Sequence, residues 1–181
     1  IRYTTKAKKA IDLASKMSKS LHHHYIGTEH ILIGLLKEGT GVAAQVLTEN
    51  GVELDKVMQL IEELIAPDAQ VLTAEAKEYS PRVLQVLEGA AREAARFHSE
   101  EIGTEHILIA MMKETECVAS RLLNTLAVNI QKMYVDILIA MGEDASLYKE
   151  DFMNGKPVKK TASDTPVLNQ YSRDLTALAA E

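Results

Sequence analysis

Apolar residues in the first third of the chain recur every three or four positions, which is the spacing of one face of an α-helix. The pattern predicts one helix capped by Thr4 and a second that opens at Gly27-Thr28. Two shorter helices should follow, ending at Asn50-Gly51 and before Pro67. The four predicted apolar faces are Ala7, Ala10, Ile11, Ala14 and Met17; Ile31, Leu32, Leu35 and Leu36; Val42, Val46 and Leu47; and Val57, Leu60, Ile61 and Leu64.

The whole pattern returns 76 positions later. Ile26–Ile33 reads Ile-Gly-Thr-Glu-His-Ile-Leu-Ile, and the same eight residues recur at Ile102–Ile109. Tyr3 corresponds to Tyr79, and no gap is needed from Tyr3 to Ala66. A repeat of this length is a structural unit used twice, and any surface that it builds is built twice. We call the two eight-residue copies the first box and the second box.

Each unit of about 60 residues is marginal for independent folding, so we expect the two to share one core. The predicted fold is all-α, with eight helices forming two tandem four-helix repeats related by pseudo-twofold symmetry. The expected boundaries are residues 1–66 for the first repeat, 67–78 for a joining loop and 79–141 for the second repeat. A polar linker should follow at 142–164, and 165–181 forms a short amphipathic segment.

The two repeats differ at one turn. Where the first has Gly39-Thr40-Gly41, the second has Thr115-Glu116-Cys117. Glycine fits the left-handed backbone that often ends a helix. The second turn therefore either holds a non-glycine residue at such an angle or has a different shape.

Composition excludes several classes of function. The chain has 181 residues, 4% aromatic and without Trp, so the core should be aliphatic. A net charge of −6 argues against nucleic acid as a partner. A single cysteine, Cys117, excludes an internal disulfide and fits a reducing compartment. We find neither an apolar run of the roughly 20 residues that span a bilayer nor a signal-peptide pattern, and we expect no membrane segment.

The candidate binding chemistry lies at helix starts. Thr4 and Ser80 should cap the first helix of each repeat, and Glu29 and Glu105 fall in the first turn of the second helix. From the residues alone, the favoured interpretation of these glutamates is a carboxylate that stabilises a helix N-terminus. Exposed N–H groups beside a carboxylate would also suit a ligand that carries a phosphate and a guanidinium group.

The six histidines raise the alternative of a metal site. Glu29-His30 is an adjacent pair, and ligands on one helix face need a spacing of three or four residues. We therefore expect His30 and His106 to be hydrogen-bonded residues near a helix start, and we assign no metal ligand. The sequence also contains no phosphate-binding Gly-x-x-x-x-Gly-Lys-[Ser/Thr] loop and no hydrolase triad, so we expect this chain to bind and not to catalyse.

The doubled Gly-Thr-Glu-His-Ile-Leu box, each copy following a Tyr-Thr or Tyr-Ser-Pro helix start, resembles the double N-terminal motif of Clp-family AAA+ unfoldases, most closely the ClpC type. The similarity covers Tyr3 to Met141. Thr165-Pro166-Val167-Leu168 and the residues that follow resemble the beginning of the first ATPase module of the same proteins.

The resemblance implies a domain that receives adaptor proteins and misfolded or arginine-phosphorylated substrates for a hexameric unfoldase working with a ClpP-type protease. ATP and Mg would belong to the full-length parent, and this fragment would need no cofactor. Carried over, the phosphoarginine sites would use Thr4 with Glu29 and Ser80 with Glu105. Lys6 and Arg82 would assist, and Tyr3 and Tyr79 would offer an adaptor or peptide surface.

Three alternatives are compatible with the sequence. A ClpA-type or ClpB-type N domain would serve a different adaptor or a disaggregase. A helical metalloenzyme using the histidines is the alternative of another class. The default location is the bacterial cytoplasm, and a chloroplast homologue is the alternative, since the chain begins without Met.

Overall fold

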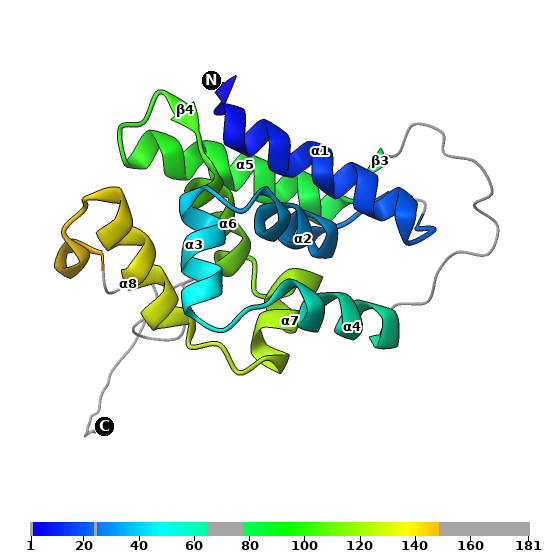
Figure 1. Cartoon of the computed structure of the whole chain (residues 1–181). Helices are drawn as coiled ribbons and strands as arrows, with labels where there is room; N and C mark the ends of the chain where they lie inside the picture. The colour runs from blue at the N-terminus through cyan, green and yellow to red at the C-terminus, as the bar shows by residue number, and fades with distance from the viewer. Residues whose placement is uncertain (1, 24, 65–77, 149–181) are drawn as a thin grey trace, which may run out of the picture. The chain divides into compact units, whose positions relative to one another are not determined.

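The computed structural model describes residues 2–23, 25–64 and 78–148. Eight α-helices lie within these ranges, four in each repeat, which confirms the predicted all-α fold (Figure 1). The helices are α1 (Thr5–Ser20), α2 (Thr28–Glu38), α3 (Val42–Glu49), α4 (Leu54–Leu64), α5 (Pro81–Arg96), α6 (Thr104–Lys113), α7 (Val118–Thr125) and α8 (Ile130–Met141).

The expected polar linker and the amphipathic terminal segment fall largely or wholly on residues 149–181, outside the described residues, as does most of the joining loop. The described start of the linker contains a 3₁₀ turn at Ala145–Leu147. No single helix in the described ranges is both long and apolar enough to cross a membrane. Thr28–Glu38 and Val42–Glu49 pass that test only as a pair, and they are bent by 95°.

The core is aliphatic, as the composition predicts. Alanines on the buried face of α1 allow α2 to approach closely, and a methyl group added to Gly34 would lie 2.1 Å from the carbonyl oxygen of Ala10. In the second repeat the small residue is on the other helix, because Gly89 of α5 faces Ala110 of α6. The glycine at the close helix contact therefore lies on the second helix in the first repeat and on the first helix in the second repeat.

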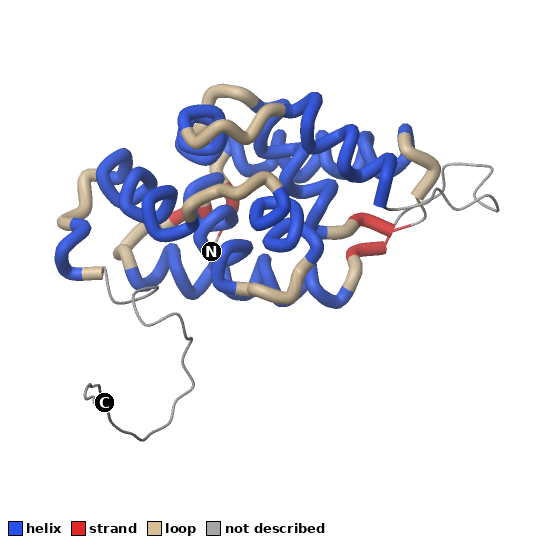
Figure 2. Tube along the Cα trace, turned by 90° about the horizontal axis from the view of Figure 1, so that it is seen from below, coloured by secondary structure: helices blue, strands red, loops and turns tan. Residues whose placement is uncertain are grey.

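Four two-residue strands are a feature that the sequence analysis did not predict. They are β1 (Arg2–Tyr3), β2 (Tyr25–Ile26), β3 (Glu78–Tyr79) and β4 (Glu101–Ile102). β1 pairs in parallel with β4, and β2 pairs in parallel with β3 (Figure 2, red). Each pair joins the start of one repeat to the box of the other. The strands are too short to show alternation, so sequence periodicity carried no signal for them.

The turn between the second and third helices has a different shape in the two repeats. In the first, Gly39 ends α2 in the left-handed region at φ +80°. In the second, Glu114 ends α6 at φ −87°, and Cys117 caps α7, its sulfur 3.5 Å from the backbone nitrogen of Ser120. This confirms the second of the two alternatives. Position 41 needs a glycine for another reason, since a methyl group there would lie 2.5 Å from the hydroxyl of Thr104.

Candidate functional site

The starts of α1 and α5 are capped as the sequence predicts. The hydroxyl of Thr4 accepts a hydrogen bond from the backbone N–H of Ala7 at 3.1 Å, and that of Ser80 accepts one from Val83 at 3.2 Å. Such a cap leaves other N–H groups of the first turn without an intrahelical partner, which gives the helix start a partial positive charge. Both helix starts are half-buried and can be approached by an anion.

The short strands determine which box lies beside which helix start. The backbone N–H of Thr4 donates to the carbonyl of Ile102 at 2.9 Å, and that of Ser80 donates to Ile26, also at 2.9 Å. Each helix start therefore adjoins the box of the other repeat. This corrects the expected pairing within each repeat. A sequence offset shows which residues of the two repeats are equivalent. It does not show which residues are neighbours, because that depends on the strand pairing between the repeats.

We name the two places by their helices. The α1 cradle consists of Thr4, Lys6 and Glu105, and the α5 cradle consists of Ser80, Arg82 and Glu29. In each box the glutamate carboxylate folds back over the glycine that begins the helix. A methyl group on Gly27 would lie 2.4 Å from Oε1 of Glu29, and one on Gly103 would lie 2.6 Å from Oε1 of Glu105. The glycines leave room for a carboxylate over the first turn, where it stabilises the helix N-terminus.

The two glutamates differ in their exposure. Glu29 is only 1% exposed, and the hydroxyl of Tyr25 donates to its Oε2 at 2.9 Å. Burial raises the pKa of Glu29, although the hydrogen bonds from its own backbone and from Tyr25 oppose the shift. Burial also raises the pKa of Tyr25, and the neighbouring Glu29 adds to this. Glu105 is half-exposed, and Glu101 stands where the first repeat has Tyr25.

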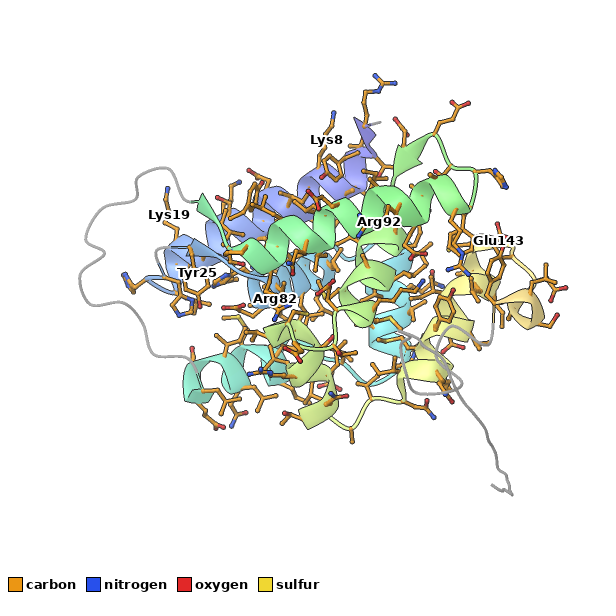
Figure 3. All side chains as sticks on the ribbon, turned by 180° about the vertical axis from the view of Figure 1, so that it is seen from behind. Lys8, Lys19, Tyr25, Arg82, Arg92 and Glu143 are labelled. Atoms are coloured by element: carbon orange, nitrogen blue, oxygen red, sulfur yellow. The ribbon has the colours of Figure 1, made fainter. Side chains whose placement is uncertain are left out.

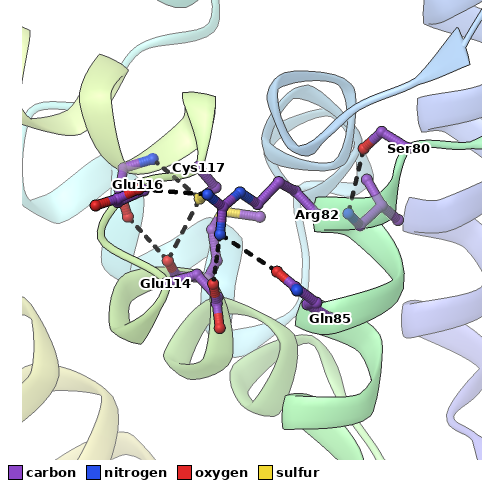
Figure 4. A network of polar contacts seen from close by, with 9 residues as sticks. Ser80, Arg82, Gln85, Glu114, Glu116 and Cys117 are labelled. Carbon is purple, nitrogen blue, oxygen red and sulfur yellow. Dashed lines mark hydrogen bonds and ion pairs between the residues drawn. The ribbon is translucent and has the colours of Figure 1, made fainter. Parts of the chain in front are cut away.

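The two cations of the cradles have different partners. Nζ of Lys6 donates to the backbone carbonyl of Thr40 at 3.2 Å. Arg82 reaches across to the equivalent turn of the second repeat, where it lies 3.4 Å from the carboxylates of both Glu114 and Glu116 (Figure 4). Arg82 therefore lies at ion-pair distance from two carboxylates, whereas Lys6 donates to one carbonyl and interacts electrostatically with the single carboxylate of Glu38.

Tyr3 lies on β1, which pairs with β4, and Tyr79 lies on β3, which pairs with β2; each tyrosine directly precedes a helix cap. Tyr79 is exposed and Tyr3 is half-buried. Burial raises the pKa of Tyr3, and the phenol of Tyr79 raises it further.

The box histidines are hydrogen-bonded near a helix start, as expected, and they are more deeply buried than the sequence suggested. Nδ1 of His30 accepts from the N–H of Gly27 at 2.8 Å, and Nδ1 of His106 accepts from Gly103 at 2.9 Å. Nε2 of His106 has no hydrogen-bond partner among the described residues. Burial lowers the pKa of His106, against the opposing influence of nearby carboxylates.

His23, Glu29 and His30 are the described group that comes closest to a metal site, with ligand atoms within 4.8 Å of one another. However, Nδ1 of His23 lies only 2.7 Å from Nε2 of His30. Two nitrogens bound to one tetrahedral zinc at about 2.0–2.1 Å would lie roughly 3.3 Å apart. The observed distance is that of a hydrogen bond, so the geometry favours a structural histidine pair over a metal centre.

The box threonines have a role that sequence reasoning missed. The hydroxyl of Thr28, in the first box, accepts from the N–H of Ala119 at 3.0 Å, at the start of α7. The hydroxyl of Thr104, in the second box, accepts from Ala43 at 3.3 Å, at the start of α3. Each box therefore caps the third helix of the other repeat. The signal was a threonine retained in both copies, but its partner could not be read from the sequence.

Comparison with known proteins identifies the repeat. The Clp repeat (R) N-terminal domain family matches residues 2–126. The chain is 36% identical over 180 residues to the chaperone protein ClpB of Oceanobacillus iheyensis, covering 99% of this chain and 22% of that protein. It is 36% identical over 182 residues to the negative regulator of genetic competence ClpC/MecB of Bacillus subtilis, covering 99% of this chain and 21% of that protein. The chain thus spans about a fifth of the length of these relatives.

Solved structures share the fold. The N-terminal domain of the chaperone ClpD from Arabidopsis thaliana aligns with a TM-score of 0.63 and 23% identity, over 78% of this chain and 95% of that one. The ClpV N-domain in complex with a VipB peptide aligns with a TM-score of 0.61 and 20% identity, over 77% and 86% of the two chains. With the family match over most of the chain, these findings show that the chain belongs to the Clp N-terminal domain family of the Clp AAA+ chaperones.

Proposed function

We propose that this chain is the substrate- and adaptor-recognition domain of a ClpC-type ATP-dependent unfoldase, and that it binds arginine-phosphorylated proteins. The observation that carries the proposal is the backbone hydrogen bond that joins each capped helix start to the box of the other repeat, in which the first-turn glutamate lies. A phosphate suits the helix N–H groups, and a guanidinium suits the carboxylate. A ligand that joins both groups would be recognised by charges of both signs at one place.

The wider role follows from the family. The full-length parent would carry the ATPase modules, with ATP and Mg, and would deliver substrates to a ClpP-type protease in the bacterial cytoplasm. A related N-domain, that of ClpV, was solved with a VipB peptide, which supports peptide or adaptor binding by this fold. In this chain, Tyr3 and Tyr79 are the residues that we assign to such contacts.

A ClpA-type or ClpB-type parent is the alternative, and identity does not separate the types. The chain is 37% identical over 180 residues to a ClpA homolog of Porphyra purpurea, covering 99% of this chain and 21% of that protein, close to the values for ClpB and ClpC. The ClpC assignment rests on the intact Gly-Thr-Glu-His sequence in both boxes and on the binding chemistry that it implies.

Calorimetric titration of the 181-residue chain with phosphoarginine tests the proposal. We expect saturable binding, with unmodified arginine much weaker because it lacks the phosphate. Combining Glu29→Gln with Glu105→Gln should abolish binding, since both guanidinium acceptors are lost. The matched control combines Glu49→Gln with Glu62→Gln, two exposed acids outside the cradles. Normal binding by the double cradle variant, or equal binding of arginine, would contradict the assignment.

A further inference from the structure

The two cradles present their glutamates differently. Oε1 of each glutamate lies against the start of its own helix, but in the α5 cradle Oε2 of Glu29 also accepts a hydrogen bond from Tyr25. With 1% of the residue exposed, a guanidinium could reach this carboxylate only if Tyr25 moved away. The intramolecular phenol therefore occupies the position that an incoming cationic donor would need. Tyr25 lies at the end of the molecule that carries β2 and β3 (Figure 3).

The α1 cradle has no such cover. The residue equivalent to Tyr25 is Glu101, which pairs through the backbone with Arg2 in the β1–β4 register. Glu105 itself is half-exposed, and no ion pair or side-chain hydrogen bond is found for it within residues 2–23, 25–64 and 78–148. A half-exposed carboxylate that makes no ion pair or side-chain hydrogen bond within these ranges, four residues from a second carboxylate, offers acceptors that a guanidinium could use directly.

The cations differ in the same sense. A phosphate at the start of α5 would compete with two ion-paired carboxylates, Glu114 and Glu116, for Arg82. One at the start of α1 would compete with a hydrogen-bonded carbonyl and with the single nearby charge of Glu38 for Lys6. Charged acceptors hold a cation more strongly than a neutral one does. Both halves of a zwitterionic ligand therefore meet less competition in the α1 cradle.

We infer that the two cradles are not equivalent: the α1 cradle, with Glu105, receives the phosphorylated guanidinium ligand, and Tyr25 keeps the α5 cradle closed. This inference rests on the proposed function and specifies which of the two places performs it. Tyr25 acts as a specificity-determining residue, because it replaces the cationic group of the ligand with a phenol of the protein.

Titration with phosphoarginine should give one site in the unaltered chain. Glu105→Gln should weaken that site by at least about tenfold, because charge-assisted hydrogen bonds are lost. Glu29→Gln should leave the affinity unchanged within about twofold, since Glu29 does not take part. In NMR titrations, amide shifts should concentrate at residues 4–7 and 102–105, and remain small at 26–29 and 80–83.

Exchange of the covering residue provides a test in which the buried Glu29 is not itself substituted. Glu101→Tyr places a phenol beside Glu105 and should lower the affinity by about tenfold or more. Tyr25→Glu uncovers Glu29 and should create a second site. Thermal melting of each variant shows whether it is folded. If Tyr25→Glu does not fold, Glu101→Tyr still tests the inference, because its position is half-exposed.

The outcomes separate the two proposals. Two equal sites in the unaltered chain, or loss of binding on Glu29→Gln with retention on Glu105→Gln, would overturn the inference and leave the proposed function standing. Absence of any phosphoarginine binding by the folded, unaltered chain would overturn the proposed function, and this inference with it.

Discussion

The reciprocal threonine caps lead to a prediction about stability. Replacing Thr104 by Val keeps the shape of the side chain but removes the acceptor of the Ala43 N–H, and replacing Thr28 by Val does the same to Ala119. Both threonines are buried, at 2% exposure, so water cannot take the place of the lost hydroxyl without rearrangement. Each change leaves an unsatisfied N–H at a helix start in the interface between the repeats.

The magnitude follows from two contributions. Loss of an N-terminal cap costs about 0.5–2 kcal/mol, and an unsatisfied buried donor costs about 1–3 kcal/mol. Because these describe the same event, we expect about 1–3 kcal/mol for each single variant. The larger value should belong to Thr28→Val, whose hydrogen bond is the shorter at 3.0 Å, against 3.3 Å for Thr104. For a domain of this size the melting temperature should fall by about 2–4 °C per kcal/mol.

Urea unfolding followed by circular dichroism at 222 nm measures both variants on one scale. Thr48→Val, an exposed position in α3, is the matched control and should change the free energy of unfolding by less than about 0.5 kcal/mol. The transition should remain single, because each cap holds the two repeats together. If both buried variants matched the control, the threonine hydroxyls would not stabilise the third helices, and our account of the interface would be refuted.

Three further predictions concern packing, pH and the free thiol. Gly34→Ala should destabilise the chain by about 1–3 kcal/mol through overpacking against the Ala10 backbone. Gly89→Ala should cost clearly less, because its added methyl group would meet only side-chain atoms, the methyl group of Ala110 at 3.2 Å and the guanidinium of Arg92 at 3.8 Å. Equal melting temperatures would argue against the close α1–α2 contact. Glu38 should contribute stability at neutral pH that is lost on acidification: burial would raise its pKa, but hydrogen bonds from Thr40 and Gly41 outweigh this and lower it from 4.5. Its contribution to the free energy of unfolding is therefore complete above about pH 4.5 and disappears as the pH falls through the lower folded pKa. Glu38→Gln should reduce stability near pH 7, and in acid its free energy of unfolding should approach that of the unaltered chain. The exposed control Glu49→Gln should not show this pH-dependent difference. The buried Cys117 should react with a thiol reagent only on unfolding, at a rate that rises with urea; fast labelling of the native chain would contradict its position at the buried start of α7.

Helical periodicity and the internal repeat were sufficient to predict the helices and their order. The apolar faces around Ala10 and Ile31 are buried as expected. The apolar residues of a helix recur at a fixed spacing, which can be recognised in a single sequence. The 76-residue offset likewise predicted two equivalent helix starts, and Thr4 and Ser80 cap them in the same way.

Contacts between the repeats could not be predicted in this way. The two-residue strands have no detectable period, and the partners of Thr28 and Thr104 lie 91 and 61 residues away in the sequence. The unequal exposure of Glu29 and Glu105 depends on one side chain, Tyr25, four residues before the first glutamate. Identical boxes therefore do not imply identical exposure of their glutamates, because the residues that cover the boxes differ between the repeats.

The β1–β4 pair has a consequence for how the chain is made. Arg2 pairs with Glu101, so 99 further residues must be synthesised before the partner of the first strand is present. A ribosome that adds about 5 to 20 residues per second needs about 5 to 20 s for that stretch. During this interval the early helices have emerged while the residues that complete their interface have not. The nascent first half should therefore be the stage at which this chain is most exposed to aggregation, and most in need of the cell's own folding assistance.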